Sequence, residues 1–128
     1  MKIEYCDLED TNHPDDAIIR IFSFNSTEVS KLIDELSKFI DSKKILDFSK
    51  LEFIERINCN LIFEIGNEDI GIISKDKWNY ICKLKKDTFV EMIEKISPFI
   101  DKCKDGTFQF LYDLNNPIEL VFSPNGTW

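Results

Sequence analysis

The segment from residue 25 to residue 41 constrains the fold most, because its apolar residues recur at spacings of three and four. This period places them along one side of an α-helix and leaves lysines, aspartates and serines on the other side. The apolar positions are Val29, Leu32, Ile33, Leu36, Phe39 and Ile40. Asn25 and Glu28 have the spacing of a capping box, in which each side chain accepts a hydrogen bond from the other residue's backbone N–H. We therefore predict an amphipathic helix that packs on a sheet.

A second amphipathic helix is predicted downstream, with Asp87 as its capping residue. Its apolar side consists of Phe89, Met92, Ile93, Ile96 and either Phe99 or Ile100. Pro98 lacks a backbone N–H, so the helix should kink or end close to it.

Alternating apolar residues predict strands around these helices. The expected strands are residues 1–6, 17–24, 60–66, 70–73, 78–84, 107–113 and 118–123. We expect 60–66 and 70–73 to form a β-hairpin, and the last two strands to form an antiparallel pair. Ile45–Ile57 fits either a strand or a helical turn. These elements predict one α+β domain over residues 1–128, with a mainly antiparallel sheet of about six or seven strands and two amphipathic helices packed on one face.

The charge of the chain restricts its partners. Twenty-four acidic and sixteen basic side chains give a formal charge of −8, which favours cationic partners over nucleic acid or anionic lipid. No apolar stretch is long enough to span a membrane, and the first residues lack the apolar core of a secretion signal. We therefore expect a cytoplasmic protein whose four widely spaced cysteines are reduced.

No constellation of residues indicates catalysis, a metal or a cofactor. The cysteines lack zinc-ligand spacing, there is no glycine-rich phosphate loop, and His13 is the only histidine. We expect His13 to be a solvated loop residue and the protein not to be an enzyme. The alternative is a small hydrolase in which a carboxylate orients His13 as a general base.

The first sixteen residues contain six acidic side chains and one lysine, and they are the best candidate for binding a basic partner. Such a cluster can accelerate encounter with a cationic surface, although acidic loops also simply keep a protein soluble. The candidate partner-binding residues are Asp7, Glu9, Asp10, Asp15, Asp16 and Trp128. Trp78 and Tyr112 are further aromatic anchors of the kind found at interfaces, but for Trp78 we favour packing within the fold.

The end of the chain adds a resemblance. Residues 106–113 and 117–128 predict a strand, a turn and a second strand that closes on Ser-Pro-x-Gly-x-Trp at 123–128. This ending resembles the tail of immunity proteins from contact-dependent growth inhibition systems, which are small bacterial proteins encoded beside polymorphic toxins. The resemblance implies a cytoplasmic, non-catalytic protein that binds one cognate toxin domain, a nuclease with a cationic active site. The alternative is a small-ligand-binding or regulatory α+β domain with an apolar pocket between sheet and helices.

Overall fold

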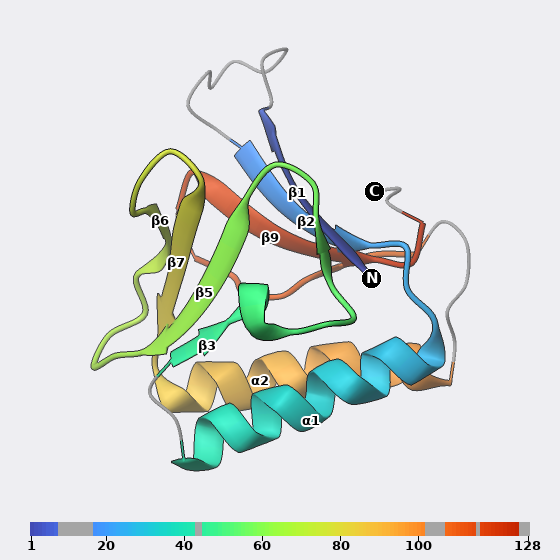
Figure 1. Cartoon of the computed structure of the whole chain (residues 1–128). Coiled ribbons are helices and arrows are strands. Elements are labelled where there is room, and N and C mark those ends of the chain that lie inside the picture. The colour runs from blue at the N-terminus through green and yellow to red at the C-terminus, as the bar shows by residue number, and fades with distance from the viewer. Residues whose placement is uncertain (8–16, 43–44, 102–106, 115, 126–128) are drawn as a thin grey trace.

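The computed structural model describes residues 1–7, 17–42, 45–101, 107–114 and 116–125. Within these ranges the chain forms nine strands, two α-helices and two short 3₁₀-helices. The strands make two sheets, and the helices α1 (Ser26–Ser42) and α2 (Lys86–Ile96) lie side by side along one side of the molecule (Figure 1). The expected α+β class is therefore correct, but the strands do not form a single sheet.

The first sheet has five strands in the order β4-β1-β2-β9-β8. Their bounds are β1 (Lys2–Asp7), β2 (Ala17–Phe22), β4 (Glu55–Arg56), β8 (Gln109–Phe110) and β9 (Ile118–Ser123). β2 is central, as its two apolar faces predict, and it pairs antiparallel with β1 and parallel with β9. β8 and β9 form the expected antiparallel pair, although β8 is much shorter than the predicted 107–113 strand.

The second sheet has four strands in the order β3-β5-β7-β6. Their bounds are β3 (Ile45–Asp47), β5 (Asn60–Ile65), β6 (Gly71–Ser74) and β7 (Asn79–Leu84). β5 and β7 run parallel from the Asn60 and Asn79 pair to the Ile65 and Leu84 pair. β6 pairs antiparallel with the other edge of β7. The predicted hairpin between 60–66 and 70–73 is therefore wrong, because β7 lies between these two strands.

Contacts of the Asp69 carboxylate explain why β5 and β6 do not form a hairpin. Its Oδ1 accepts hydrogen bonds from the backbone N–H of Lys85 at 2.9 Å and from the hydroxyl of Thr88 at 2.7 Å. The backbone N–H of Gly66 also donates to the carbonyl of Leu84 at 2.9 Å. These contacts hold residues 66–69 across the end of β7, so the chain cannot fold straight back along β5.

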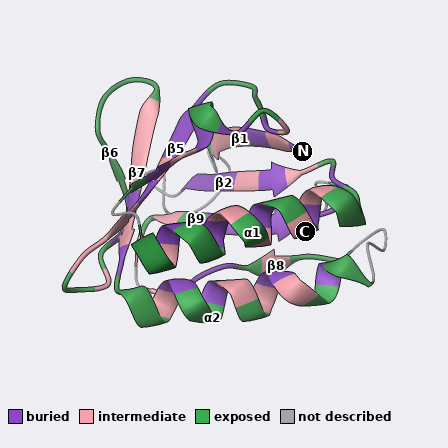
Figure 2. Cartoon of the chain, turned by 60° about the horizontal axis from the view of Figure 1, so that its bottom comes forward, coloured by how far each residue is buried: buried purple, intermediate pink, exposed green. Residues whose placement is uncertain are grey.

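The first helix begins as the sequence predicts. The backbone N–H of Glu28 donates to Asn25 Oδ1 at 3.0 Å, and that of Asn25 donates to Glu28 Oε1 at 3.2 Å. The predicted apolar side faces inward: the helix buries Val29, Leu32, Leu36 and Phe39, while Ile33 and Ile40 are partly buried. Figure 2 shows the alternation of buried and exposed positions along both helices.

The second helix differs from its prediction at its start. It begins at Lys86, and Asp87 lies inside its first turn, so Asp87 does not cap it. At its other end α2 stops at Ile96, and Pro98 lies in the 3₁₀-helix η2 (Ser97–Ile100), as the proline predicts. Phe99 rather than Ile100 continues the buried side.

The expectation of a mainly antiparallel sheet is met only in part, because long parallel ladders join β2 to β9 and β5 to β7. Each helix connects the two sheets: α1 leads from β2 in the first sheet to β3 in the second, and α2 leads from β7 back to β8. The parallel strands β5 and β7 are joined through β6. The ambiguous segment 45–57 forms β3, the 3₁₀-helix η1 (Phe48–Lys50) and β4, which is neither of the simple alternatives.

Phenylalanine rings join the second sheet to both helices. Phe63 of β5 packs against Phe89 of α2, with ring centroids 5.2 Å apart, and against Phe48 of η1 at 4.9 Å. Phe39 of α1 completes this group, 5.0 Å from Phe89. One face of the second sheet is therefore covered by the helices, and aromatic packing forms the contact between them.

Candidate interaction surface

Among the residues predicted to bind a partner, the described part of the chain includes Asp7. It is exposed at the end of β1 and pairs with Ala17 of β2. The other predicted residues are outside the described residues: Glu9, Asp10, Asp15, Asp16 and Trp128. His13 also lies outside them. Of the predicted acidic segment, the structure therefore places Asp7 at the end of β1.

Asp7 lies beside a contact between the two sheets. Tyr5 of β1 stacks on Tyr80 of β7, with ring centroids 5.0 Å apart and planes 12° apart. Burial raises the pKa of Tyr5, and a hydrogen bond and the negative charge of Asp7 raise that pKa further. The amide of Asn58 fixes the same strand, because it accepts from the backbone N–H of Tyr5 at 2.7 Å and donates to its carbonyl at 2.9 Å. This end of β1 is thus held against β7 and the residues before β5.

Trp78 is the most prominent apolar group at this end. Its side chain is 56% exposed, so the expectation that it packs within the fold is wrong. It lies in the turn between β6 and β7, where Asp76 Oδ1 accepts from the backbone N–H groups of Trp78 and Asn79 at 2.9 and 3.0 Å. Trp78 also lines a pocket of about 320 Å³ together with Ile57 and other residues before β5. Tyr112, by contrast, is buried, so it is not available as an interface anchor.

A chain of polar side chains supports this turn. Asn60 Nδ2 donates to Asp47 Oδ1 at 2.9 Å and to Asn79 Oδ1 at 3.2 Å, and Asn79 Nδ2 donates to both carboxylate oxygens of Asp76 at 3.1 Å. Partial burial opposes ionisation of Asp47, but hydrogen bonds from Asn60 and Ser49 outweigh it and lower the pKa of Asp47. Asp47 is therefore an anion at neutral pH, and the turn that presents Trp78 is connected to β3 through fixed hydrogen bonds.

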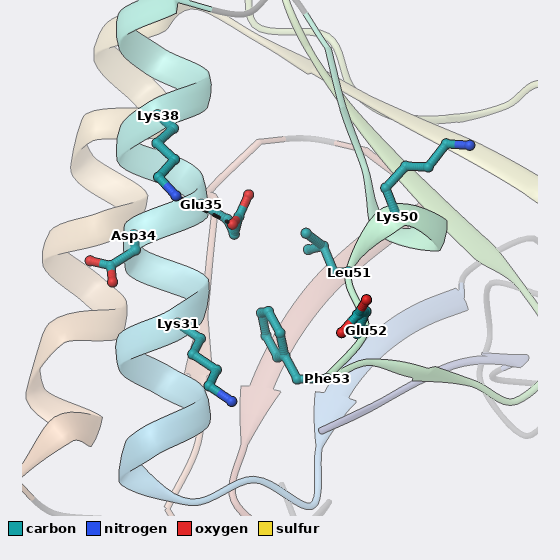
Figure 3. Close-up of a pocket in the computed structure, with 8 residues that line it drawn as sticks. All are labelled: Lys31, Asp34, Glu35, Lys38, Lys50, Leu51, Glu52 and Phe53. Atoms are coloured by element: carbon teal, nitrogen blue, oxygen red, sulfur yellow. Dashed lines mark ion pairs between the residues drawn. The ribbon is translucent and has the colours of Figure 1, made fainter.

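A second depression lies between α1 and residues 50–53 and has a volume of about 400 Å³ (Figure 3). Leu51 and Phe53 point toward α1, and Lys31 Nζ lies 6.0 Å from the centroid of the Phe53 ring. Lys38 pairs with Glu35 at 3.8 Å. Lysines and carboxylates are equally numerous in its lining, so the charge of this groove selects neither a cation nor an anion.

The described thiols are not poised as nucleophiles. Cys6, Cys59 and Cys82 are free, and burial raises the pKa of Cys59 to about 12. Burial also raises the pKa of Cys82, so both thiols stay protonated at neutral pH. Over the described ranges there is no group of three histidine, cysteine or acidic side chains placed to hold a metal ion. Nor does that part of the chain contain a helix long and apolar enough to cross a membrane.

The chain matches no model of a known protein family, and no curated protein is significantly similar to it. The surface of the protein is therefore the guide to its function. It presents an exposed tryptophan, Trp78, on a hydrogen-bonded turn near β1, and the acidic segment of the chain follows β1 in the sequence.

Proposed function

We propose that this protein is an immunity protein, which binds a cognate toxin domain and neutralises it by steric and electrostatic occlusion. The observation that supports this most is the exposure of Trp78 at the end of the molecule where Asp7 leads into the acidic segment. Figure 1 places the β6–β7 turn and the described ends of β1 and β2 in the upper part of the molecule, away from the helices.

The chemistry of such a partner follows from the charge. A nuclease active site is cationic because it must hold phosphate, and a protein with a formal charge of −8 is attracted to it. Opposite charges raise the association rate, and a desolvated aromatic anchor slows dissociation. Acidic side chains and Trp78 would supply these two contributions.

Co-expression with the protein encoded by the neighbouring gene tests the proposal. If that protein is a toxin, its expression alone should arrest growth, and co-expression with this chain should restore growth through a stoichiometric complex. Trp78→Ala should weaken the complex by about 10-fold or more, as expected for an interface anchor. Val90→Ala is the matched control, because Val90 is an apolar residue of α2 that is also largely exposed, at 41%. A neighbouring protein that is not toxic, or that does not bind this chain, would contradict the proposal.

A further inference from the structure

The second sheet has an outer face that carries a row of isoleucines and that neither of the described helices covers. The helices pack on the face that carries Phe63, so the residues on either side of Phe63 in β5, which alternate with it, point outward. The register places Ile62 beside Ile81 of β7, and Ile81 beside Ile73 of β6. Three neighbouring strands thus present a continuous row of isoleucines on the outer face.

The outward positions of the central parallel pair, β5 and β7, are mixed in character. Ile62 and Ile81 are apolar and partly buried, and they are flanked by Asn60, Glu64, Asn79 and Lys83. The exposure increases outward from this pair, reaching 42% at Ile73 and 52% at Ile45 of β3.

The charges on this face indicate what covers it. Asp47 lies beside Ile62 at one end of the isoleucine row, and Glu64 lies in the next row, beside Ile45. Lys83 also lies on this face and its ammonium is paired with Glu64 at 3.6 Å, so these two charges offset each other and Asp47 leaves the face with a net negative charge. A second copy of the chain would bring these carboxylates, and two molecules of charge −8, against each other. A basic surface would instead complement them.

We propose that the isoleucine face, formed by Ile45, Ile62, Ile73 and Ile81 with Asp47 and Glu64 beside them, is the surface that docks on a basic protein. This inference rests on the proposed function, since the basic protein is the cognate toxin domain. Isoleucines form the dry centre of the interface, carboxylates pair with lysines or arginines of the partner, and Trp78 lies at the end of β7 as an adjoining anchor.

Substitutions at exposed positions of this face test the assignment. Ile73→Lys and Ile73→Asp both place a charge in the isoleucine row, but a basic partner repels the lysine and tolerates the aspartate better. Ile45→Lys tests the opposite edge of the face. Val90→Lys, on α2, is the control for an added lysine at an exposed apolar site. Circular dichroism establishes that each variant is folded, and titration calorimetry with the purified product of the neighbouring gene measures the dissociation constant.

We expect Ile73→Lys and Ile45→Lys to weaken binding by about 30-fold or more, Ile73→Asp to weaken it less than Ile73→Lys, and Val90→Lys to bind like the wild type. If wild type binds and both lysine variants bind equally well, the isoleucine face is not the interface, although the proposed function stands. Equal losses of affinity from Ile73→Lys and Ile73→Asp would contradict the inference that the partner's surface is basic. A wild-type dimer that Ile73→Lys converts to a monomer would make a second copy the occupant and overturn the inference. Failure of the wild type to bind at all would overturn the proposed function itself.

Discussion

The side-chain amide of Asn116 donates a hydrogen bond to the backbone carbonyl of Ile70 at 2.9 Å. The same nitrogen lies 3.3 Å from the carbonyl oxygen of Ile72. Asn116 thus occupies the edge of β6 with side-chain atoms, where another strand would otherwise pair. Because Asn116 precedes β9, this contact joins the two sheets without a continuous ladder.

Replacing Asn116 by alanine should destabilise the fold. The substitution removes the donor to Ile70 and Ile72, and also the acceptor Oδ1 that the backbone N–H of Ile118 reaches at 2.8 Å. The partly buried backbone groups would lose their partners, which predicts a loss of about 1–3 kcal/mol in the free energy of unfolding. Urea denaturation measures it, with Asn67→Ala in an exposed turn as control. Equal stability of the two variants would show that Asn116 does not tie the sheets together.

Gly71 should resist substitution for two separable reasons. Its φ of +92° is strained for any residue with a Cβ atom, and a Cβ built there would lie 2.5 Å from Asn116 Nδ2. Gly71→Ala should therefore cost more than the roughly 1 kcal/mol expected for unfavourable backbone alone. In the Asn116→Ala background the contact with Asn116 Nδ2 is removed and the contact with Tyr112 Cε2 at 3.3 Å remains, so the second substitution should cost less than it does in the wild type. Additive effects in this double-mutant cycle would contradict the close approach.

The capping box of α1 should contribute measurably to stability. Asn25→Ala removes the acceptor for the backbone N–H of Glu28 and should lower the free energy of unfolding by about 1 kcal/mol. Asn25→Ser keeps a capping oxygen, so it should retain most of the stability. Thermal unfolding followed by circular dichroism separates these two outcomes, and a serine variant as unstable as the alanine variant would argue against the cap.

Asp69 should make the fold sensitive to acid. Burial opposes ionisation of Asp69, but hydrogen bonds from Lys85 N–H and the Thr88 hydroxyl, with the charge of Lys85, lower its pKa below the ordinary 3.8. Because the folded pKa is depressed, the stabilisation is present above about pH 4 and is lost as pH falls through the folded pKa. Asp69→Asn should therefore be less stable than wild type at pH 7 and lose less stability between pH 7 and pH 3. Thr88→Val should give a smaller effect in the same direction. Parallel pH profiles for wild type and Asp69→Asn in urea denaturation would contradict this account.

The elements that sequence predicts correctly are those decided by neighbouring residues. The α1 cap needs only Asn25 and Glu28, and the buried side of that helix follows from its own spacing. The order of strands in the second sheet is different, because it depends on Asp69 reaching Lys85, sixteen residues later. The sequence between β5 and β6 looks like a hairpin turn, and no local pattern shows that its carboxylate is used elsewhere.

The candidate surface was predictable only in part. The alternation of apolar residues along the strand correctly places Cys82 and Leu84 on a buried face. The same alternation, continued back to residue 78, wrongly predicts that Trp78 is buried as well. The usable signal was the charged run of residues 75–77, since Asp76 forms the turn that ends the alternation. The isoleucine face was not predictable, because it requires the parallel register of β5 and β7, which the sequence pattern does not specify.

The most direct test of the account is the dependence of the association rate on ionic strength, because it shows whether this acidic protein is attracted to a basic partner. Stopped-flow mixing with the purified product of the neighbouring gene would measure the association rate from low salt to about 0.5 M salt. We predict that the rate falls by about tenfold or more over this range while the dissociation rate changes much less. An association rate that is independent of salt would contradict the electrostatic account, whatever the affinity of the complex.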